Sequence, residues 1–337
     1  MNQFSSEPLV CPICKAGSLI MSYRAAPLDY SDNHDYPIYI CSRCGYGMTG
    51  DIKQQTSSLY VGGCYDVNEK MWHMLIQPFL SALERGKLSY LNADKGISKK
   101  LLEIGCGKGR FLETAKKHGF LVYGIEPSPR SFAFASSRLG ESVAHIGLEE
   151  IDEASTFPLK FDYIMLWHVL EHLTDPSKVL YKIKEKLEPD GRVMIAVPNF
   201  ASFQARLGKA NWYHLDPPRH VHHFTPQSLQ LLAKATGFEV EKIFFNSFYQ
   251  NFVGELVTIV NKVLPGNNVV FNGLRINRAY LNHFGAWRAW AIFIFCSVLS
   301  MLIAIPVLLL VLFNQLADRS GTMVMIIKSI EAQTNIK

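Results

Sequence analysis

A glycine-rich turn between an apolar segment and a helical pattern is the first feature of this sequence that can perform chemistry. Residues 101–111 read L-L-E-I-G-C-G-K-G-R-F, with glycines at alternate positions. Because glycine has no Cβ, the backbone of such a turn can approach a ligand closely. The dinucleotide-binding fingerprint has its third glycine one residue later, where this chain has Arg110. The pattern therefore predicts a strand, a ligand-binding turn and a helix of a different class.

An acidic residue follows the turn at a separation that suits a nucleoside ligand. Residues 121–127 read L-V-Y-G-I-E-P, which predicts a second strand ending at Glu126. Glu126 lies about 20 residues beyond Gly105, the separation at which nucleotide-binding βαβ units place a carboxylate on ribose hydroxyls. The two strands therefore predict one site that can hold a ribose.

The G-x-G-x-G turn preceded by Glu103 resembles motif I of the class I S-adenosylmethionine-dependent methyltransferases. Residues 161–176 contain F-D-x-I followed by V-L-E-H-L-x-D-P, which is similar to the fourth-strand motif of the same family. The resemblance implies S-adenosylmethionine as cofactor, with the turn after the third strand at the adenine and the end of the fourth strand facing the methionine moiety. The cofactor-binding residues that it implies are Glu103, Gly105, Cys106, Gly107, Gly109, Glu126, Leu148, Glu149, Trp167 and His168.

Two C-x-x-C pairs near the N-terminus have the spacing of a metal site. Cys11 and Cys14 form one pair, and Cys41 and Cys44 form the other. Each pair offers two thiolates from one tight turn, and two such turns complete a tetrahedral Cys₄ zinc site. Residues 1–56 are too few to build their own core, so a structural zinc would supply much of their folding energy. Redox activity of either pair is the alternative.

Histidines at two places are candidates for a catalytic base, which methyl transfer to an oxygen requires. His172 follows the fourth strand, whereas His220 and His223 lie in the histidine-dense run 211–226. Each of them alone is better explained as a structural or substrate-orienting group, but we expect one of the three to be the base. The W-x-x-L-D-x-P-R-H-x-x-H-F-T run also resembles a bacterial subgroup of these methyltransferases that often accompanies surface-polysaccharide and lipid-linked biosynthesis.

The elements around these residues alternate between β and α, which predicts a Rossmann-like doubly wound sheet. The family resemblance implies seven strands with the last one antiparallel. We expect a methyltransferase core over residues 57–247 plus 321–337, in which Tyr60 and Tyr65 of a gating loop either contact the cofactor or pack the ribbon on the core. The predicted strands after the turn are 121–126, 143–146, 161–167, 193–197, 238–245 and 322–328, and the predicted helices are 131–139, 176–187 and 226–236.

Residues 248–320 form an insertion between strands six and seven, and it contains the apolar segment 287–313. Its uncharged run of about 25 residues is long enough to cross a bilayer. A single crossing would put strand seven on the wrong side of the membrane. The run is therefore expected either to turn back at Pro306 as a re-entrant hairpin or to lie in the interface as a monotopic anchor, with Trp287, Trp290 and Arg319 near its ends. A buried helix hairpin or a dimer interface is the alternative.

Composition limits the partners and the compartment. The net charge of +5 over 337 residues comes without a basic run, so no nucleic-acid partner is expected. The polar N-terminus has no signal-peptide pattern, and paired cysteines in a reducing cytosol favour a metal over disulfides. We expect the protein at the cytoplasmic face of the inner membrane, in contact with membrane lipid, with a purely cytoplasmic location as the alternative.

The leading interpretation is an S-adenosylmethionine-dependent O-methyltransferase that acts on a glycan, a lipid-linked sugar or another amphiphilic acceptor at the membrane face. A sugar C-methyltransferase and a quinone-type small-molecule O-methyltransferase are alternatives within the enzyme class. Zinc-ribbon methyltransferases of ribosomal RNA are a weaker alternative because of the apolar segment. A non-catalytic, cofactor-binding membrane scaffold is the alternative from another class.

Overall fold

A computed structural model of the chain describes residues 9–28, 34–52, 73–91, 98–263, 268–274 and 277–330. Tyr60 and Tyr65, predicted in the gating loop, lie outside these ranges. The chain forms two compact units, each assembled from separate stretches. The sheet unit comprises Val67–Val197, Ala233–Ile243 and Val324–Lys337. The cysteine unit comprises Met1–Asp66, Pro198–Leu232 and Phe244–Met323.

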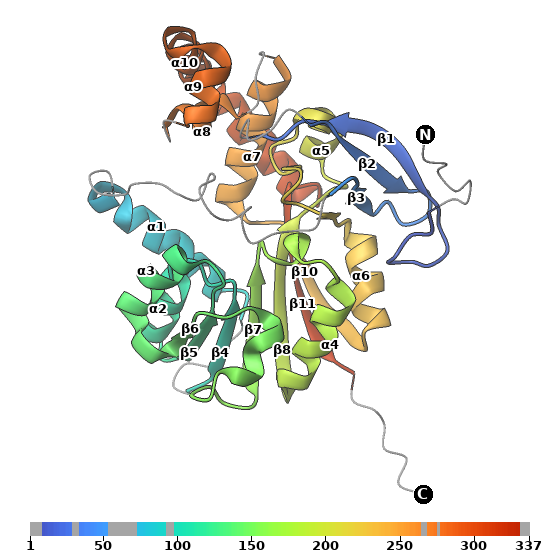
Figure 1. The fold of residues 1–337 in the computed structure, drawn as a ribbon, viewed down its shortest axis with the longest axis vertical. Coiled ribbons are helices and arrows are strands. Elements are labelled where there is room, and N and C mark those ends of the chain that lie inside the picture. Colours follow the sequence, from blue (N-terminus) through green and yellow to red (C-terminus); the bar gives the residue numbers. More distant parts are fainter. Residues whose placement is uncertain are drawn as a thin grey trace, which may run out of the picture. The chain divides into compact units, whose positions relative to one another are not determined.

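A seven-stranded sheet with the order β10-β11-β8-β7-β4-β5-β6 is the main feature of Figure 1. Strands β4, β5, β6, β7 and β8 pair in parallel, and the last strand is antiparallel, as the family resemblance implies. The central strands are nearly continuous apolar runs because helices cover both faces of such a sheet. The strand bounds are β4 Lys100–Ile104, β5 Leu121–Ile125, β6 Val143–Ala144, β7 Phe161–Trp167, β8 Leu187–Pro198, β10 Phe238–Phe244 and β11 Thr322–Ser329.

The connections between these strands are helical, with side-chain caps at their first turns. Ser128 caps α3 by accepting from the Ser131 amide, and Asp175 caps α4 by accepting from the amides of Ser177 and Lys178. Each cap fixes the residue at which the helix begins after its strand, and so positions the loop at the carboxyl edge of the sheet. The helices are α1 His73–Leu88, α2 Arg110–Lys117, α3 Pro129–Leu139, α4 Pro176–Lys186 and α6 Pro226–Ala235, with short 3₁₀ helices η3 Leu148–Glu153 and η4 Leu170–His172.

A second sheet in the cysteine unit has the order β1-β2-β3-β9. Strands β1 (Leu19–Ala25), β2 (Tyr36–Cys41) and β3 (Gly47–Thr49) form an antiparallel meander around the cysteine pairs. The fourth strand, β9 (His222–His223), comes from the histidine-dense run and pairs with β3. Cys41, the last residue of β2, and the histidine-dense run therefore belong to one sheet, which the sequence did not predict.

The insertion consists of helices that leave β10 and return to β11: α7 (Phe248–Val263), α8 (Val269–Leu274), α9 (Arg278–Phe284) and α10 (Ala286–Leu316). Pro306 lies inside α10, so the predicted hairpin at Pro306 is wrong. A proline removes one backbone hydrogen bond and tends to kink a helix, but an otherwise uniformly apolar helix can continue through it. The two ends of the insertion nevertheless remain within one unit.

Helix α10 packs on the other helices of the insertion along one side only. Its buried residues are Ala289, Cys296, Val307, Val311 and Asn314, and their spacings are close to whole turns at about 3.6 residues per turn. Ala289 and Cys296 join a core cluster with Val260, Val269 and Tyr280 of α7, α8 and α9. The opposite side of α10 is left without partners among the described residues of this unit.

Candidate functional site

The glycine turn after β4 has the geometry of a ligand cradle. The amides of Gly105 and Cys106 both donate to the Ile125 carbonyl, at 2.9 and 3.1 Å, which ties the turn to the end of β5. Gly105, Gly107 and Gly109 all have positive φ, a conformation that favours glycine. A Cβ at Gly105 would press on Val169 and one at Gly109 on Leu139, whereas one at Gly107 would meet no atom within 4 Å. Gly107 therefore borders the open space into which a ligand can fit.

Glu126 faces this turn, as predicted. Its Oε2 accepts from the Gly107 amide at 2.8 Å, and its Oε1 accepts from the Ser128 amide at 2.8 Å. Burial raises the pKa of Glu126, while the two amides and the charge of His145 oppose that rise. Each carboxylate oxygen keeps a second lone pair, so both can still accept from the hydroxyls of a ribose. This arrangement fits the nucleoside part of S-adenosylmethionine.

Glu103 lies on β4 just before the turn and is buried, with its Oε2 unpaired. Burial raises its pKa well above the usual value, and the positive charge of Lys87 opposes that rise. Lys87 was not predicted as a site residue. Its ammonium lies 4.6 Å from the centre of the Trp167 ring and forms an ion pair with Glu84 Oε2, 2.8 Å away. A cation from α1 therefore lies among the residues expected to hold the methionine part of the cofactor.

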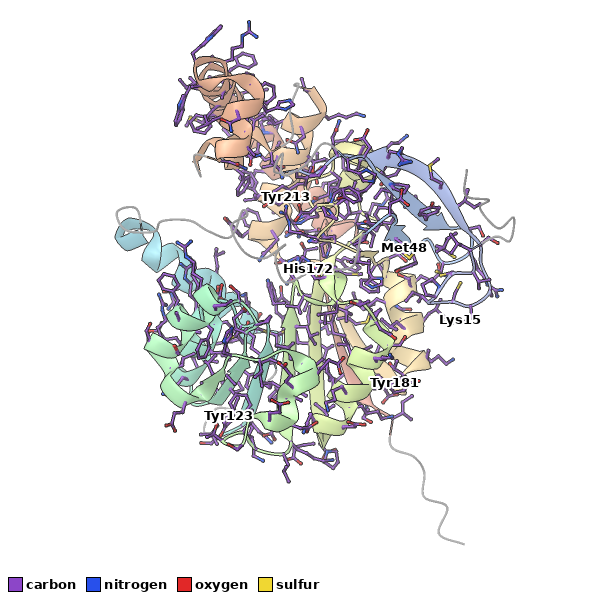
Figure 2. All side chains as sticks on the ribbon, viewed as in Figure 1. Lys15, Met48, Tyr123, His172, Tyr181 and Tyr213 are labelled. Carbon is purple, nitrogen blue, oxygen red and sulfur yellow. The ribbon has the colours of Figure 1, made fainter. Side chains whose placement is uncertain are left out.

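The end of β7 supplies the other residues predicted near the methionine moiety. Trp167 is half-buried, and His168 follows it with a positive φ of 54°. His168 Nδ1 donates to Glu171 Oε1 at 3.1 Å, and Glu171 is only 1% exposed. His172, in the same short helix as Glu171, lies beside the carboxyl end of β7 (Figure 2). The sheet unit thus gathers the predicted ribose and methionine ligands at one edge of its sheet.

The structure gives less direct support to three other residues predicted to bind the cofactor. Cys106 is buried, and a Cβ added at Gly124 would lie 2.8 Å from its Sγ, so its thiol packs toward β5. Leu148 is buried at the start of η3, whereas Glu149 is exposed. Glu150 rather than Glu149 closes this turn, by accepting from the Gly147 amide at 2.9 Å. The adenine contacts of Leu148 and Glu149 stay a prediction.

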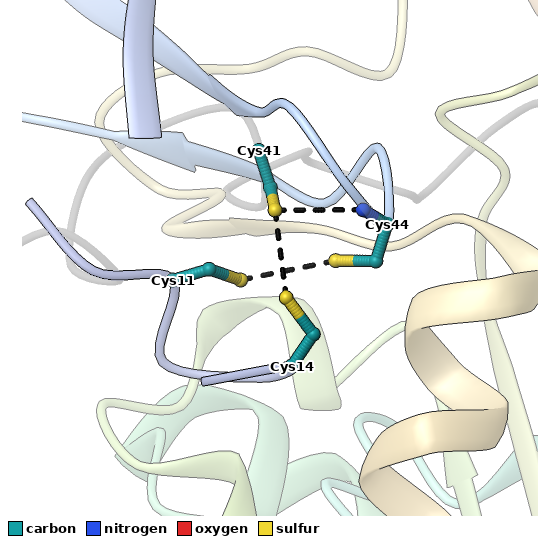
Figure 3. Close-up of side chains that lie close together, drawn as sticks. All are labelled: Cys11, Cys14, Cys41 and Cys44. Atoms are coloured by element: carbon teal, nitrogen blue, oxygen red, sulfur yellow. Dashed lines mark hydrogen bonds between the residues drawn. The ribbon is translucent and has the colours of Figure 1, made fainter. Parts of the chain in front are cut away.

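The four N-terminal cysteines converge as the spacing predicted (Figure 3). Cys11 Sγ lies 3.8 Å from Cys44 Sγ, and Cys14 Sγ lies 3.6 Å from Cys41 Sγ. Four thiolates about 2.3 Å from a tetrahedral zinc ion would stand about 3.8 Å apart, so the spacing suits that metal. A Cβ at Gly17 would lie 2.5 Å from Cys41 Sγ, which explains the glycine after the first pair. The donor set leaves no fourth position open for catalysis.

His223 lies in the β3–β9 pair and is 3% exposed. The Thr49 hydroxyl donates to the His220 carbonyl at 2.7 Å, so it can only accept from His223 Nε2, 2.9 Å away. Burial, with the nearby His222, lowers the pKa of His223 to about 3. A neutral ring with a fixed tautomer favours a structural role for His223.

His220 belongs to the same unit, whereas His172 belongs to the sheet unit. His220 is buried, and its Nδ1 donates to the His214 carbonyl at 2.7 Å, which leaves Nε2 as the nitrogen for any further partner. The assignment of a base to His172 or His220 stays a prediction.

Comparisons with known proteins identify similar chains. A family model described as a methyltransferase domain matches residues 73–243. The ubiquinone biosynthesis O-methyltransferase of Pasteurella multocida is 32% identical over 34% of this chain, and the match spans 52% of that relative. The enzyme of the same name from Paraburkholderia phymatum is 29% identical over 55% of this chain and 85% of its own length.

The chain spans about half the length of the Pasteurella relative, and 37% of a mitochondrial enzyme of the same name from Schizosaccharomyces pombe, which is 33% identical. A solved S-adenosylmethionine-dependent methyltransferase from Archaeoglobus fulgidus is 21% identical, with a TM-score of 0.44 over 75% of this chain and 94% of that one.

Proposed function

The chain belongs to the methyltransferase domain family, and on that premise we propose that it transfers a methyl group from S-adenosylmethionine to a hydroxyl oxygen of an amphiphilic acceptor. The observation that carries the proposal is the pairing of Gly107 and Glu126, an open glycine cradle beside a buried carboxylate. Glu126 would hold the ribose, and Glu103, Trp167 and Lys87 would surround the methionine part. The bound cofactor supplies an electrophilic methyl group, and the chain's residues orient the acceptor and remove its proton.

The relatives favour a hydroxylated aromatic acceptor of the quinone type over the glycan that the sequence first suggested. Their names refer to O-methylation in ubiquinone biosynthesis. A glycan or lipid-linked sugar is the second candidate, which the histidine-dense run favours. Both candidates share hydroxyl groups on a ring attached to an apolar tail.

The outward side of α10 supports a membrane-bound acceptor. Of the described residues, α10 is the one helix with the length and composition of a membrane span. Only 17% of its most apolar window is buried, and Met301, Leu302 and Ile305 are 76, 73 and 72% exposed. The helix is about 46 Å long at about 1.5 Å per residue, longer than a hydrocarbon core of about 30 Å. A helix that is packed along one side and apolar along the other suits an anchor lying in the plane of the cytoplasmic membrane surface.

Zinc at the four cysteines would have a structural role. With all four ligands supplied by the chain, the ion would link the turns at Cys11–Cys14 and Cys41–Cys44 and leave methyl transfer to the sheet unit. The Thr225 hydroxyl donates to the Cys44 carbonyl at 2.9 Å, so the same link would also fix the segment that carries His220.

Turnover by the full-length protein in detergent tests the proposal. Release of S-adenosylhomocysteine is measured with an alkyl catechol, an alkyl glucoside or no acceptor. We expect acceptor-dependent turnover, greatest with the catechol and abolished in Glu126→Ala. Failure of the wild-type protein to bind S-adenosylmethionine would reject the proposal. Cofactor binding without turnover on any hydroxylated amphiphile would favour the scaffold alternative.

A further inference from the structure

Two pairs of thiols connect the first cysteine turn to the second (Figure 3). Cys14 Sγ lies 3.6 Å from Cys41 Sγ, and Cys11 Sγ lies 3.8 Å from Cys44 Sγ. The four thiols differ in exposure, because Cys14 is half-buried whereas the other three are buried. Oxidation of cysteine follows solvent access, so an oxidant in solution reaches Cys14 first.

Cys41 is placed to complete a disulfide with an oxidised Cys14. Its Sγ accepts from the amides of Arg43 and Cys44 at 3.4 and 3.5 Å, which fix the sulfur within its own turn. The sulfurs of a disulfide lie about 2.05 Å apart, so forming one would close the 3.6 Å gap to Cys14 by about 1.5 Å. It would also remove two of the four ligands of a tetrahedral zinc site.

The turn that begins at Cys41 is directly connected to the histidine-dense run. The Cys41 amide donates to the Tyr46 carbonyl at 2.8 Å, so a shift of Cys41 acts on Tyr46. Tyr46 is fully buried, and its hydroxyl forms a hydrogen bond with His222 Nδ1. The Tyr46 ring also lies 5.9 Å from the ring centres of His222 and Phe224. Tyr46 therefore links the cysteine turn to the run.

Further contacts fasten the run to the same turn and to β3. The Thr225 hydroxyl donates to the Cys44 carbonyl at 2.9 Å, and the Thr49 amide donates to the Val221 carbonyl at 2.9 Å. Strand β9 itself has two residues and pairs with β3. A strand this short depends on its partner for stability. The position of the run is thus set by the turn that carries Cys41 and Cys44.

We infer that Cys14 and Cys41 form an oxidant-sensitive clasp. In the reduced, zinc-bound protein the clasp holds the histidine-dense run against β3, and a disulfide between the two cysteines releases the run. The clasp goes beyond the proposed function and does not depend on it. One consequence does rest on the proposed function: because His220 lies in the run, oxidation would displace one of the candidate bases and slow methyl transfer.

The chemistry needs a two-electron oxidant such as hydrogen peroxide. The Cys14 thiolate attacks one peroxide oxygen, the O–O bond breaks, and Cys14 becomes a sulfenic acid while hydroxide leaves and takes up a proton. The Cys41 thiolate then attacks the Cys14 sulfur, the S–S bond forms, the S–O bond breaks, and the second hydroxide leaves as water. The two thiolates lose two electrons, and the peroxide becomes two waters with uptake of two protons.

The experiment treats full-length, zinc-loaded protein in detergent with hydrogen peroxide. A chromogenic chelator follows zinc release, peptide mass spectrometry maps the disulfides, and amide hydrogen exchange is measured over residues 46–49 and 220–225. We expect zinc to leave and Cys14–Cys41 to be the first disulfide. Exchange in the two segments should rise by about 10- to 100-fold, as expected for a segment that gains local opening. Dithiothreitol and zinc together should restore slow exchange.

Tyr46→Phe tests the connection without touching a cysteine, since it removes only the hydroxyl that bonds to His222. It should keep zinc but raise exchange over residues 220–225 by about 10-fold before any oxidation, the effect of one lost buried hydrogen bond. Cys296→Ser, in the core that α10 shares with α7, α8 and α9, is the matched control and should respond to peroxide as the wild type does. Affinity for S-adenosylmethionine checks folding, because its predicted ligands belong to the sheet unit.

Three results would each overturn the inference: zinc retained after Cys14 is oxidised, a first disulfide between Cys11 and Cys44, or unchanged exchange after zinc has left. Protein purified without zinc would refute the structural metal. Exchange in its reduced and oxidised forms would still decide the clasp, with equal rates counting against it. A protein that shows the oxidant response but binds no S-adenosylmethionine would refute the proposed function and leave the clasp standing.

Discussion

The outward side of α10 allows the membrane anchor to be tested without disturbing the fold. The perturbation is the double substitution Met301→Lys and Ile305→Lys, two positions one turn apart that are both more than 70% exposed. Neither belongs to the buried stripe that includes Val307 and Val311. The substitutions should therefore leave packing in the cysteine unit unchanged while placing two charges in the predicted membrane contact.

The magnitude follows from the exposed surface. Twelve large apolar side chains of α10 are exposed, from Trp287 to Leu316. Full burial of such a side chain contributes about 1.5–3 kcal/mol, and each is already partly covered, so about 1 kcal/mol apiece gives about 12 kcal/mol of gross attraction to lipid. Each lysine should remove about 2 kcal/mol through lost burial and the cost of a charge near hydrocarbon. Two lysines then lower vesicle partitioning by about 4 kcal/mol, roughly a thousandfold.

Vesicle flotation at high salt is the assay, with S-adenosylmethionine binding as the check on folding. The matched control is Ala133→Lys with Ser137→Lys, which adds the same two charges one turn apart on the exposed side of α3. Across a lipid titration, we expect the control to float with vesicles like the wild type and the α10 variant to need about a thousandfold more lipid. Equal flotation of both variants would refute the anchor. Wild-type protein that is soluble and dimeric, and that becomes monomeric with the α10 lysines, would show instead that this side is a subunit interface.

Three further predictions concern single side chains. Gly107→Val should abolish S-adenosylmethionine binding by filling the open space at the turn. Glu126→Gln should weaken binding by about 2–3 kcal/mol, which calorimetry measures. Unchanged affinity in both variants would refute the assignment of the cofactor site. Cys14→Ser should release zinc from the purified protein while cofactor binding persists, and protein that carries no stoichiometric zinc would argue against the metal site. Burial raises the pKa of Glu255 to about 7 in the folded protein. Below pH 4.5 the carboxyl is protonated in both the folded and the unfolded protein, so it has no pH-dependent effect. Between pH 4.5 and 7 it ionises only in the unfolded protein, which lowers the stability of the fold. The stability of Glu255→Gln relative to wild type should accordingly grow by about 3 kcal/mol over that range in denaturant titrations, and parallel profiles would contradict the assignment.

Much of the sheet could be predicted from the sequence because its strands are buried on both faces. Such strands are apolar runs bounded by turn residues, and β5, β7 and β11 begin and end within a residue or two of their predicted bounds. The cap of α6 is equally local, since the Thr225 hydroxyl accepts from the Ser228 amide at 3.1 Å. The relation of Gly107 to Glu126 follows from local spacing alone.

The features that escaped prediction depend on contacts between distant segments. Strand β9 is two residues long and exists only because β3 offers it a partner, so it has no periodicity of its own. Asn251 and Glu255 of α7 have polar side chains, yet both are buried in the folded unit. Lys87 lies in a helix with no recognised motif, and its place over Trp167 appears only when α1 is packed.

The pairing of β3 with β9 affects the order in which the protein can fold during its synthesis. Thr49 leaves the ribosome about 170 residues before His223, which corresponds to roughly 10–35 s of synthesis at about 5–20 residues per second. During that interval the cysteine pairs are available to metal while the β3 edge of their sheet is still open. An open edge is a template for pairing with other chains. Early capture of zinc would make the three-stranded meander rigid and ready for β9 when it emerges. Zinc supply during translation should therefore affect the yield of folded protein more than zinc added after purification.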